Sequence, residues 1–177
     1  MNTAMNTSVL VLLGVTAALG LGLTARGERW RPAWGGVLLV GLLAVAGALA
    51  WAGGDAPDGL AEGTVVAAVV AAVTGGGPVA TAVLAAADPR AAGVGGGPQD
   101  PEILRGGAWI GVLERAVVAA TLLAGSAEGL VVLAAVKGLG RYAELRVAAA
   151  AERFIIGTLV SGLWAAACVG VAMLLAA

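Results

Sequence analysis

Long apolar stretches, separated by short polar or charged segments, make up most of this chain. A bilayer core about 30 Å thick needs roughly 20 apolar residues in helical conformation, so runs of about that length predict membrane-spanning helices. The pattern predicts six of them, at residues 7–25, 35–52, 61–87, 107–124, 127–142 and 154–175. We therefore expect an all-α integral membrane bundle of about six transmembrane helices.

The third predicted helix contains Gly75, Gly76, Gly77 and Pro78 in succession. Pro removes a helical hydrogen bond and glycines loosen the backbone, so we predict that this helix is interrupted at Gly75 to Pro78. Two interpretations are open. A discontinuous helix would free backbone groups to face a substrate or ion, as in some transporters. A kink or short loop would only absorb the surplus length of the segment.

The sequence between the third and fourth predicted helices is polar and rich in Gly and Pro. It predicts a flexible cytoplasmic linker over residues 88–105. This linker separates an N-terminal three-helix half, residues 1–87, from a C-terminal three-helix half, residues 106–177, which carries the charged motif. Its GVGGGP lacks the Gly-Lys-Ser/Thr ending of a phosphate loop, so no nucleotide site is expected.

The positions of Lys and Arg predict the orientation, because positively charged loops tend to stay in the cytoplasm. With six spans, the loop Lys and Arg all fall on one side, and the acidic loop with Asp55 and Asp58 falls on the other. Both termini are then outside. A competing interpretation makes residues 107–136 one helix and places the Lys and Arg that follow it outside. A tight hairpin at Gly125-Ser126 avoids this and is preferred.

Composition agrees with a membrane protein and excludes several functions. Apolar residues make up 60% of the 177 and charged residues 12%, against about 45–50% and 25% in soluble domains. The net charge of −1, without a basic tract, argues against nucleic-acid binding. The chain has no His, and Cys168 is its single Cys, so histidine chemistry and an intrachain disulfide are excluded. We expect no cofactor and no metal.

Residue usage also bears on the source and the membrane. Almost all of the ten basic residues are Arg, and Ala, Gly and Val are heavily used, as in high-GC bacterial genomes. The N-terminus has no Lys or Arg before the apolar run that begins at about Val9, so this run is expected to be a retained helix and not a signal peptide. We therefore expect a bacterial inner-membrane protein with both termini on the extracytoplasmic side.

Charged residues within the C-terminal apolar segments are the main candidate chemistry. Glu114 and Arg115 lie well inside the fourth predicted helix, where a charge is costly and needs a partner or water. Positions equally far from the hairpin turn lie level, so Glu114 faces Lys137 on the fifth helix. We expect Glu114 to pair with Arg141 or Lys137. Arg115 is expected to extend its side chain to the cytoplasmic interface.

Further polar residues accompany this charge network. They are Glu144 after the fifth helix, Glu152 and Arg153 at the entry to the sixth, and Thr158 and Ser161 within it. In one interpretation the network only fixes helix register and orientation, because buried charge pairs are often structural. In the other, it lines a polar cavity open to the cytoplasm that binds an anion, a proton or a lipid headgroup, with Glu114 as the switchable acid.

The order and spacing of these residues resemble the C-terminal part of a family of small multi-pass bacterial membrane proteins, catalogued as a domain of unknown function. The residues concerned are Gly106, Gly107, Ile110, Gly111, Leu113, Glu114, Arg115, Lys137, Arg141, Glu144, Ala151, Glu152, Ile156, Gly157, Thr158, Leu159 and Ser161. Gly138 stands where the family usually has Ser, and Arg153 where it usually has an aromatic residue. The resemblance covers about a third of the chain. It implies a membrane protein and nothing catalytic.

Three classes of function remain. The first is a structural or partner-binding membrane subunit, as a homo-oligomer or with another membrane protein, because Gly- and Ala-rich helices suit close packing. The second is a small transporter or channel with a cytoplasm-facing polar cavity at Glu114, Lys137 and Arg141. The third is an enzyme acting on lipid, for which the sequence offers no nucleophile or metal cluster. The first is preferred, with the lipid bilayer as surroundings and no enzymatic activity.

Overall fold

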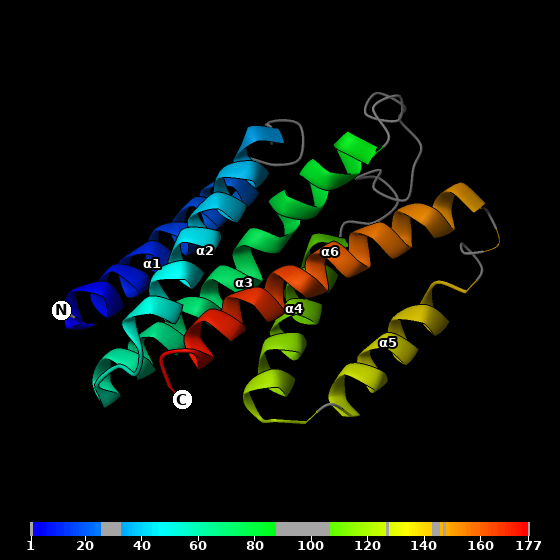
Figure 1. Cartoon of the computed structure of the whole chain (residues 1–177). Helices are drawn as coiled ribbons and strands as arrows, with labels where there is room; N and C mark the ends of the chain where they lie inside the picture. Colours follow the sequence, from blue (N-terminus) through cyan, green and yellow to red (C-terminus); the bar gives the residue numbers. More distant parts are fainter. Residues whose placement is uncertain are drawn as a thin grey trace.

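The structure is a computed structural model that describes residues 2–25, 33–87, 107–126, 128–142, 146 and 148–176. The predicted linker, residues 88–105, lies outside the described residues. Within them the fold is all-α, as the hydrophobic pattern predicts (Figure 1). The six helices are α1 (Asn2–Ala25), α2 (Ala33–Gly53), α3 (Asp58–Ala87), α4 (Gly107–Leu123), α5 (Glu128–Gly140) and α6 (Ala148–Met173).

Four of these helices are long and apolar enough to cross a membrane. They contain the stretches Thr3–Ala25, Trp34–Gly53, Asp58–Ala87 and Ala150–Met173. The other two are shorter: α4 has 17 residues and α5 has 13, which correspond to about 26 and 20 Å of helix. Large apolar side chains on all six helices face outward. A helical bundle with such an apolar surface is suited to lipid, and it indicates an integral membrane protein.

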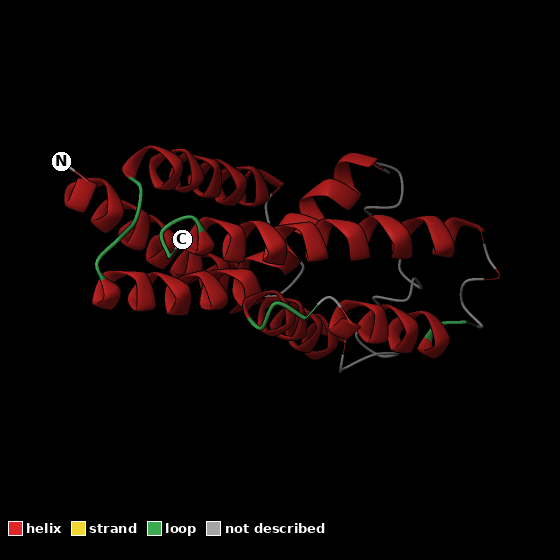
Figure 2. Ribbon diagram, turned by 60° about the horizontal axis from the view of Figure 1, so that its bottom comes forward, coloured by secondary structure: helices red, strands yellow, loops and turns green. Residues whose placement is uncertain are grey.

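The α3 helix forms the centre of the bundle. It contacts α1, α2, α4 and α6, and Figure 1 shows it between α1 and α2 on one side and α4 and α6 on the other. Figure 2 shows that the described segments are helices joined by loops. Small side chains such as Ala71 and Ala72 are fully buried along α3, and Ala165 of α6 is equally buried. Small residues let membrane helices approach closely. The α5 helix lies at the edge of the bundle and packs chiefly against α4.

The predicted interruption of the third helix is not found. α3 continues from Asp58 to Ala87 with Pro78 inside it. Pro78 has no amide hydrogen for the carbonyl of Thr74, four residues earlier. The hydroxyl of Thr24 on α1 lies 3.1 Å from that carbonyl and shares its hydrogen between it and the Gly20 carbonyl of α1, at 2.8 Å. Because a neighbouring helix pairs with the carbonyl that Pro78 frees, the helix can pass through this segment without a break.

Glycines at Pro78's N-terminal side allow other elements to come close to α3. A Cβ atom on Gly75 would lie 2.5 Å from the ring of Trp164 on α6, and one on Gly76 would collide with the side chain of Arg115 on α4. On α1, a Cβ atom on Gly20 would lie 2.9 Å from the backbone of Gly75. The glycines that predicted an interruption are therefore the places where α1, α4 and α6 meet α3.

The chain reverses between α4 and α5 in the predicted hairpin. Gly125 has a φ angle of +65°, which glycine adopts without strain. The amide of Ser126 donates to the carbonyl of Thr121 at 2.9 Å, and the amide of Gly125 donates to that of Leu122 at 3.1 Å. These are the two hydrogen bonds of a Schellman motif, which ends a helix. The alternative of a single helix over residues 107–136 is therefore excluded.

Hydrogen bonds also join the chain segments at the end of the bundle where α1 begins. The buried side chain of Asn6 on α1 donates to the carbonyls of Gly54 and Asp55, at 3.3 and 3.2 Å. The amide of Ala56 donates to the carbonyl of Leu175 at 2.9 Å. The start of α1, the α2–α3 loop and the end of the chain therefore lie together.

Candidate functional site

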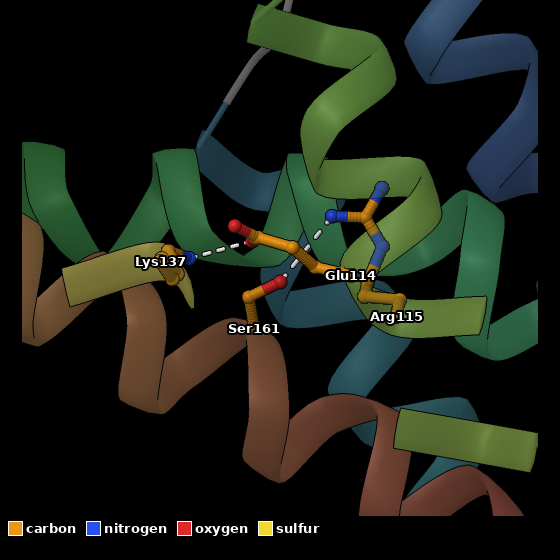
Figure 3. A network of polar contacts seen from close by, with 4 residues as sticks. All are labelled: Glu114, Arg115, Lys137 and Ser161. Atoms are coloured by element: carbon orange, nitrogen blue, oxygen red, sulfur yellow. Dashed lines mark hydrogen bonds and ion pairs between the residues drawn. The ribbon is translucent and has the colours of Figure 1, made fainter. Parts of the chain in front are cut away.

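An ion pair links the two helices of the hairpin. Lys137 Nζ on α5 lies 2.5 Å from Glu114 Oε2 on α4, as Figure 3 shows. The two side chains are 19% and 14% exposed. Lys137 also lies 5.4 Å from the ring centroid of Phe154 on α6, within cation–π range. The prediction that Glu114 pairs with Lys137 or Arg141 is thus met by Lys137, because the turn at Gly125 sets the two helices in that register.

The side chain of Arg115 points into the bundle, so its predicted extension to the cytoplasmic interface is wrong. Arg115 is only 6% exposed. Its Nε donates to the carbonyl of Val73 on α3 at 2.9 Å, and its Nη1 donates to Ser161 Oγ on α6 at 3.3 Å (Figure 3). Gly76 and Gly111 have no side chains that would occupy the space of Arg115. These two glycines open an inward path, and Arg115 therefore joins α4 to α3 and α6.

Side chains from three different helices donate to a short run of α3 carbonyls. They are Trp164 Nε1 to Ala71 at 3.1 Å, Arg115 Nε to Val73 at 2.9 Å, and Thr24 Oγ1 to Thr74 at 3.1 Å. Each donor is expensive to bury without an acceptor in an apolar bundle. We call these three donors and their acceptors the α3 carbonyl cluster. It holds α1, α4 and α6 at one level of α3.

Trp164→Phe removes one donor of the α3 carbonyl cluster. Trp164 is 4% exposed, so we expect the free energy of unfolding to fall by about 1 kcal/mol or somewhat more, since a buried hydrogen bond and part of the ring are lost. Denaturation in detergent, followed by circular dichroism, measures this. Trp51→Phe is the control, because Trp51 is 79% exposed. An equal loss of stability in both variants would contradict a role for the Trp164 hydrogen bond.

The other predicted site residues lie at several places. Ser161 is bonded to Arg115, and Thr158 lies one turn earlier on α6 with its Oγ1 buried and without a hydrogen-bond partner among the described residues. Arg141 is half-buried after the last turn of α5. In the first turns of α6, Glu152 is exposed and Arg153 half-buried. Glu144 lies outside the described residues.

Sequence reasoning missed Val73 and Trp164 as parts of this site. The signal that could have found them is the Gly75-Gly76-Gly77-Pro78 run, because a helix segment without side chains next to a proline has accessible carbonyls. It was interpreted as an interruption instead. When an apolar helix contains a charged residue, a glycine-rich run before a proline on another helix offers carbonyl groups that can accept its hydrogen bonds.

The described residues contain no group of three or more His, Cys, Asp and Glu side chains that could hold a metal ion. A hollow of about 250 Å³ lies at the hairpin turn, lined by Thr121, Leu122, Gly125, Ser126 and Leu130. Glu114, Lys137 and Arg115 do not line this hollow. In this arrangement, Glu114 and Lys137 link α4 to α5, and Arg115 links α4 to α3 and α6.

The fold and the site together define an all-helical membrane bundle in which one ion pair and one buried guanidinium connect α4 to its neighbours. Comparison with known protein families, with curated proteins and with solved structures finds no match for this chain.

Proposed function

We propose that this protein is a structural membrane subunit of a bacterial inner membrane, which associates with a second copy of itself through α5. The observation that carries the proposal is the exposure of α5, which has no buried residue. Its outer face consists of four large apolar side chains that are each 63–75% exposed, namely Val131, Val132, Val136 and Leu139. We call these four residues the α5 stripe.

The length of α5 argues that a protein and not lipid alone covers the α5 stripe. Glu128 and Lys137 lie about 14 Å apart along the helix, at a rise of about 1.5 Å per residue. The hydrocarbon core is about 30 Å thick, so lipid around this helix would have to thin or meet a charge. Short membrane helices relieve such a mismatch by oligomerising.

A second copy fits the α5 stripe because the stripe carries no charge. In a two-fold dimer the same surface meets itself, so a charged stripe would repel its copy. Ala135 and Gly138, on either side of Val136, would allow the two backbones to approach. The Glu114–Lys137 pair and the bonds of Arg115 hold the hairpin to the bundle, and so present the stripe outward.

Charge distribution and composition support the membrane and the orientation in this proposal. Asp55 and Asp58 lie at the end of the bundle that holds the α1 start and the chain's last described residues. Lys137 and Arg146 lie at or beyond the C-terminal end of α5. By the positive-inside rule, this distribution supports an orientation with both termini outside. The preference for Arg over Lys, the heavy use of Ala, Gly and Val, and the resemblance of the charged motif to small bacterial membrane proteins support a bacterial inner membrane.

Disulfide cross-linking tests the proposed dimer. In a Cys168→Ala background, we expect Val132→Cys to form a covalent dimer on oxidation in native membranes, because the α5 stripes of two copies would be in contact. Val66→Cys on α3 is the matched control, since Val66 and Val132 are 64% and 63% exposed. The proposal fails if Val131→Cys, Val132→Cys and Val136→Cys all remain monomeric, or if Val66→Cys cross-links equally well.

A small transporter or channel with a polar cavity at Glu114, Lys137 and Arg141 is the second candidate. Glu114 and Lys137 are 14% and 19% exposed, so the ion pair is not fully enclosed by protein. This partial exposure is the observation that favours a transporter or channel. The burial of Arg115 at 6% and its bonds to α3 and α6 support the structural function more strongly.

A further inference from the structure

The exposed aromatic side chains of this protein lie where helices begin or end. Those that the structure describes are Trp34 and Trp51 of α2, Trp109 of α4 and Tyr142 just after α5, and they are 64–79% exposed. Each lies within two residues of the first or last residue of its helix. By contrast, Trp164 lies well inside α6, is buried, and is bonded to the Ala71 carbonyl.

The α2 helix has such a ring near each end of one apolar face. Trp34 and Trp51 are about 26 Å apart along the helix, at a rise of about 1.5 Å per residue. Nothing in α2 is charged. The exposed positions between the two rings are Val37, Leu38, Val40, Gly41, Ala44, Val45 and Ala48. We call these positions, together with the two rings, the α2 face.

The chemistry and the spacing of the two rings fit a lipid bilayer. Trp prefers the headgroup level, because its ring is apolar while its N–H needs a polar partner. The separation of about 26 Å is close to the thickness of the hydrocarbon core, about 30 Å, so both rings can reach a headgroup region at once. A protein partner would not require this spacing. Figure 1 shows α2 and α5 at opposite sides of the bundle, so a second copy at the α5 stripe would leave the α2 face open.

The packing of α2 on α3 shows what lies midway between the two rings. The midpoint is near Leu43, about 10 Å along α2 from Gly36. A Cβ atom on Gly36 would lie 3.4 Å from the Cα of Val79 on α3. The two helices run in opposite directions, so moving back about 10 Å along α3 leads from Val79 to about Val73. The Val73 carbonyl accepts the hydrogen bond from Arg115 Nε.

We propose that the α2 face contacts lipid over its whole length, with the rings of Trp34 and Trp51 in the two headgroup regions. The centre of the bilayer then lies level with Val73, and Arg115 is bonded to α3 near the bilayer midplane. A charged side chain is most costly at that depth, so the α3 carbonyl cluster lies where its hydrogen bonds matter most. This surface is separate from the α5 stripe and does not depend on the proposed dimer.

Quenching of Trp fluorescence by brominated lipids tests this surface. The full chain is reconstituted in vesicles of phosphatidylcholine with bromine on the acyl chains, either close to the headgroup or close to the chain end. Two variants each keep Trp164 and one further Trp, either Trp34 or Trp51, and have Phe at the other Trp positions. Trp164 is kept because it is buried and bonded, and a chain with Trp164 alone gives its contribution.

Bromines near the headgroup should quench Trp34 and Trp51 about twofold or more strongly than bromines near the chain end, because both rings lie at headgroup level. Ala44→Trp, in a chain whose only other Trp is Trp164, is the matched control. Ala44 is exposed on the same face and close to the midpoint. A ring at this position should therefore show the opposite order of quenching. Circular dichroism verifies that each chain is helical.

Three results would overturn the proposal. Stronger quenching of Trp34 or Trp51 by bromines near the chain end would place that ring at the wrong depth. Stronger quenching of Ala44→Trp by bromines near the headgroup would move the midplane away from Arg115. No quenching of Trp34 or Trp51 by either lipid would mean that protein covers the α2 face. If the chains with fewer Trp residues do not fold, the quenching lost between the parent and Trp34→Phe or Trp51→Phe gives the same comparison.

Discussion

Gly20→Ala is expected to lower the free energy of unfolding by about 1–3 kcal/mol, the usual range for forcing extra volume into a packed core. The added Cβ would lie 2.9 Å from both the Cα and the amide nitrogen of Gly75. These are backbone atoms, which no rotamer change can move away. α1 and α3 must then separate, and the bond from Thr24 to the Thr74 carbonyl lengthens with them. Chemical denaturation in detergent measures the change.

Gly22→Ala is the matched control for this prediction. Gly22 lies two residues after Gly20 on α1, and a Cβ atom there would meet nothing within 4 Å. The variant should be neutral or more stable by up to about 1 kcal/mol, because Ala favours a helix over Gly. The same fall in stability for both variants would mean that glycine is needed in α1 for a reason other than the contact with α3.

Glu114→Gln should destabilise the hairpin by about 1–3 kcal/mol. The change leaves the Lys137 ammonium, whose side chain is 19% exposed, without its carboxylate partner. Removing one partner of a fully buried pair costs about 3–5 kcal/mol, and the partial exposure of this pair reduces that figure. Unfolding in detergent, followed by circular dichroism, gives the free energy.

The double variant Glu114→Gln with Lys137→Met separates the ion pair from the individual side chains. No unpaired charge remains in the double variant. We therefore expect its loss of unfolding free energy to be about 1–2 kcal/mol smaller than the sum of the losses in Glu114→Gln and Lys137→Met. Arg146→Gln is the charge control, because Arg146 is exposed and lies over the ring of Tyr142. It should change stability little. Strict additivity in the double variant would show that the 2.5 Å contact contributes nothing.

The part of the site that sequence could predict is the part that depends on one turn. Glu114 and Lys137 lie on helices joined by the short turn at Gly125, so counting outward from the turn was enough to find their contact. Gly125 and Ser126 are turn residues whose backbone preferences are local. The contact of Lys137 with the ring of Phe154 does not follow from that count, since it depends on where α6 packs.

The position of Arg115 could not be predicted in the same way. A long side chain on a helix leans toward the helix N-terminus, here the predicted cytoplasmic end, so local geometry favours extension of Arg115 to the interface. The inward path exists because Gly76 on α3 and Gly111 on α4 have no side chains in the space that the Arg115 side chain occupies. Gly111 lies on the same helix as Arg115, but only the packing of α4 on α3 brings Gly76 against it. The same holds for Trp164, whose acceptor Ala71 is far away in the sequence.

The sequence by itself determined that this protein is a bundle of apolar helices with a tight hairpin near its C-terminal end. Long apolar runs in lipid must satisfy their backbone hydrogen bonds internally, and helices do so without reference to any other segment. The continuity of α3 and the partners of Arg115 were decided only by the tertiary structure. A freed carbonyl or a buried guanidinium is satisfied by whichever group a neighbouring helix places within reach, and that group lies on a different segment of the chain.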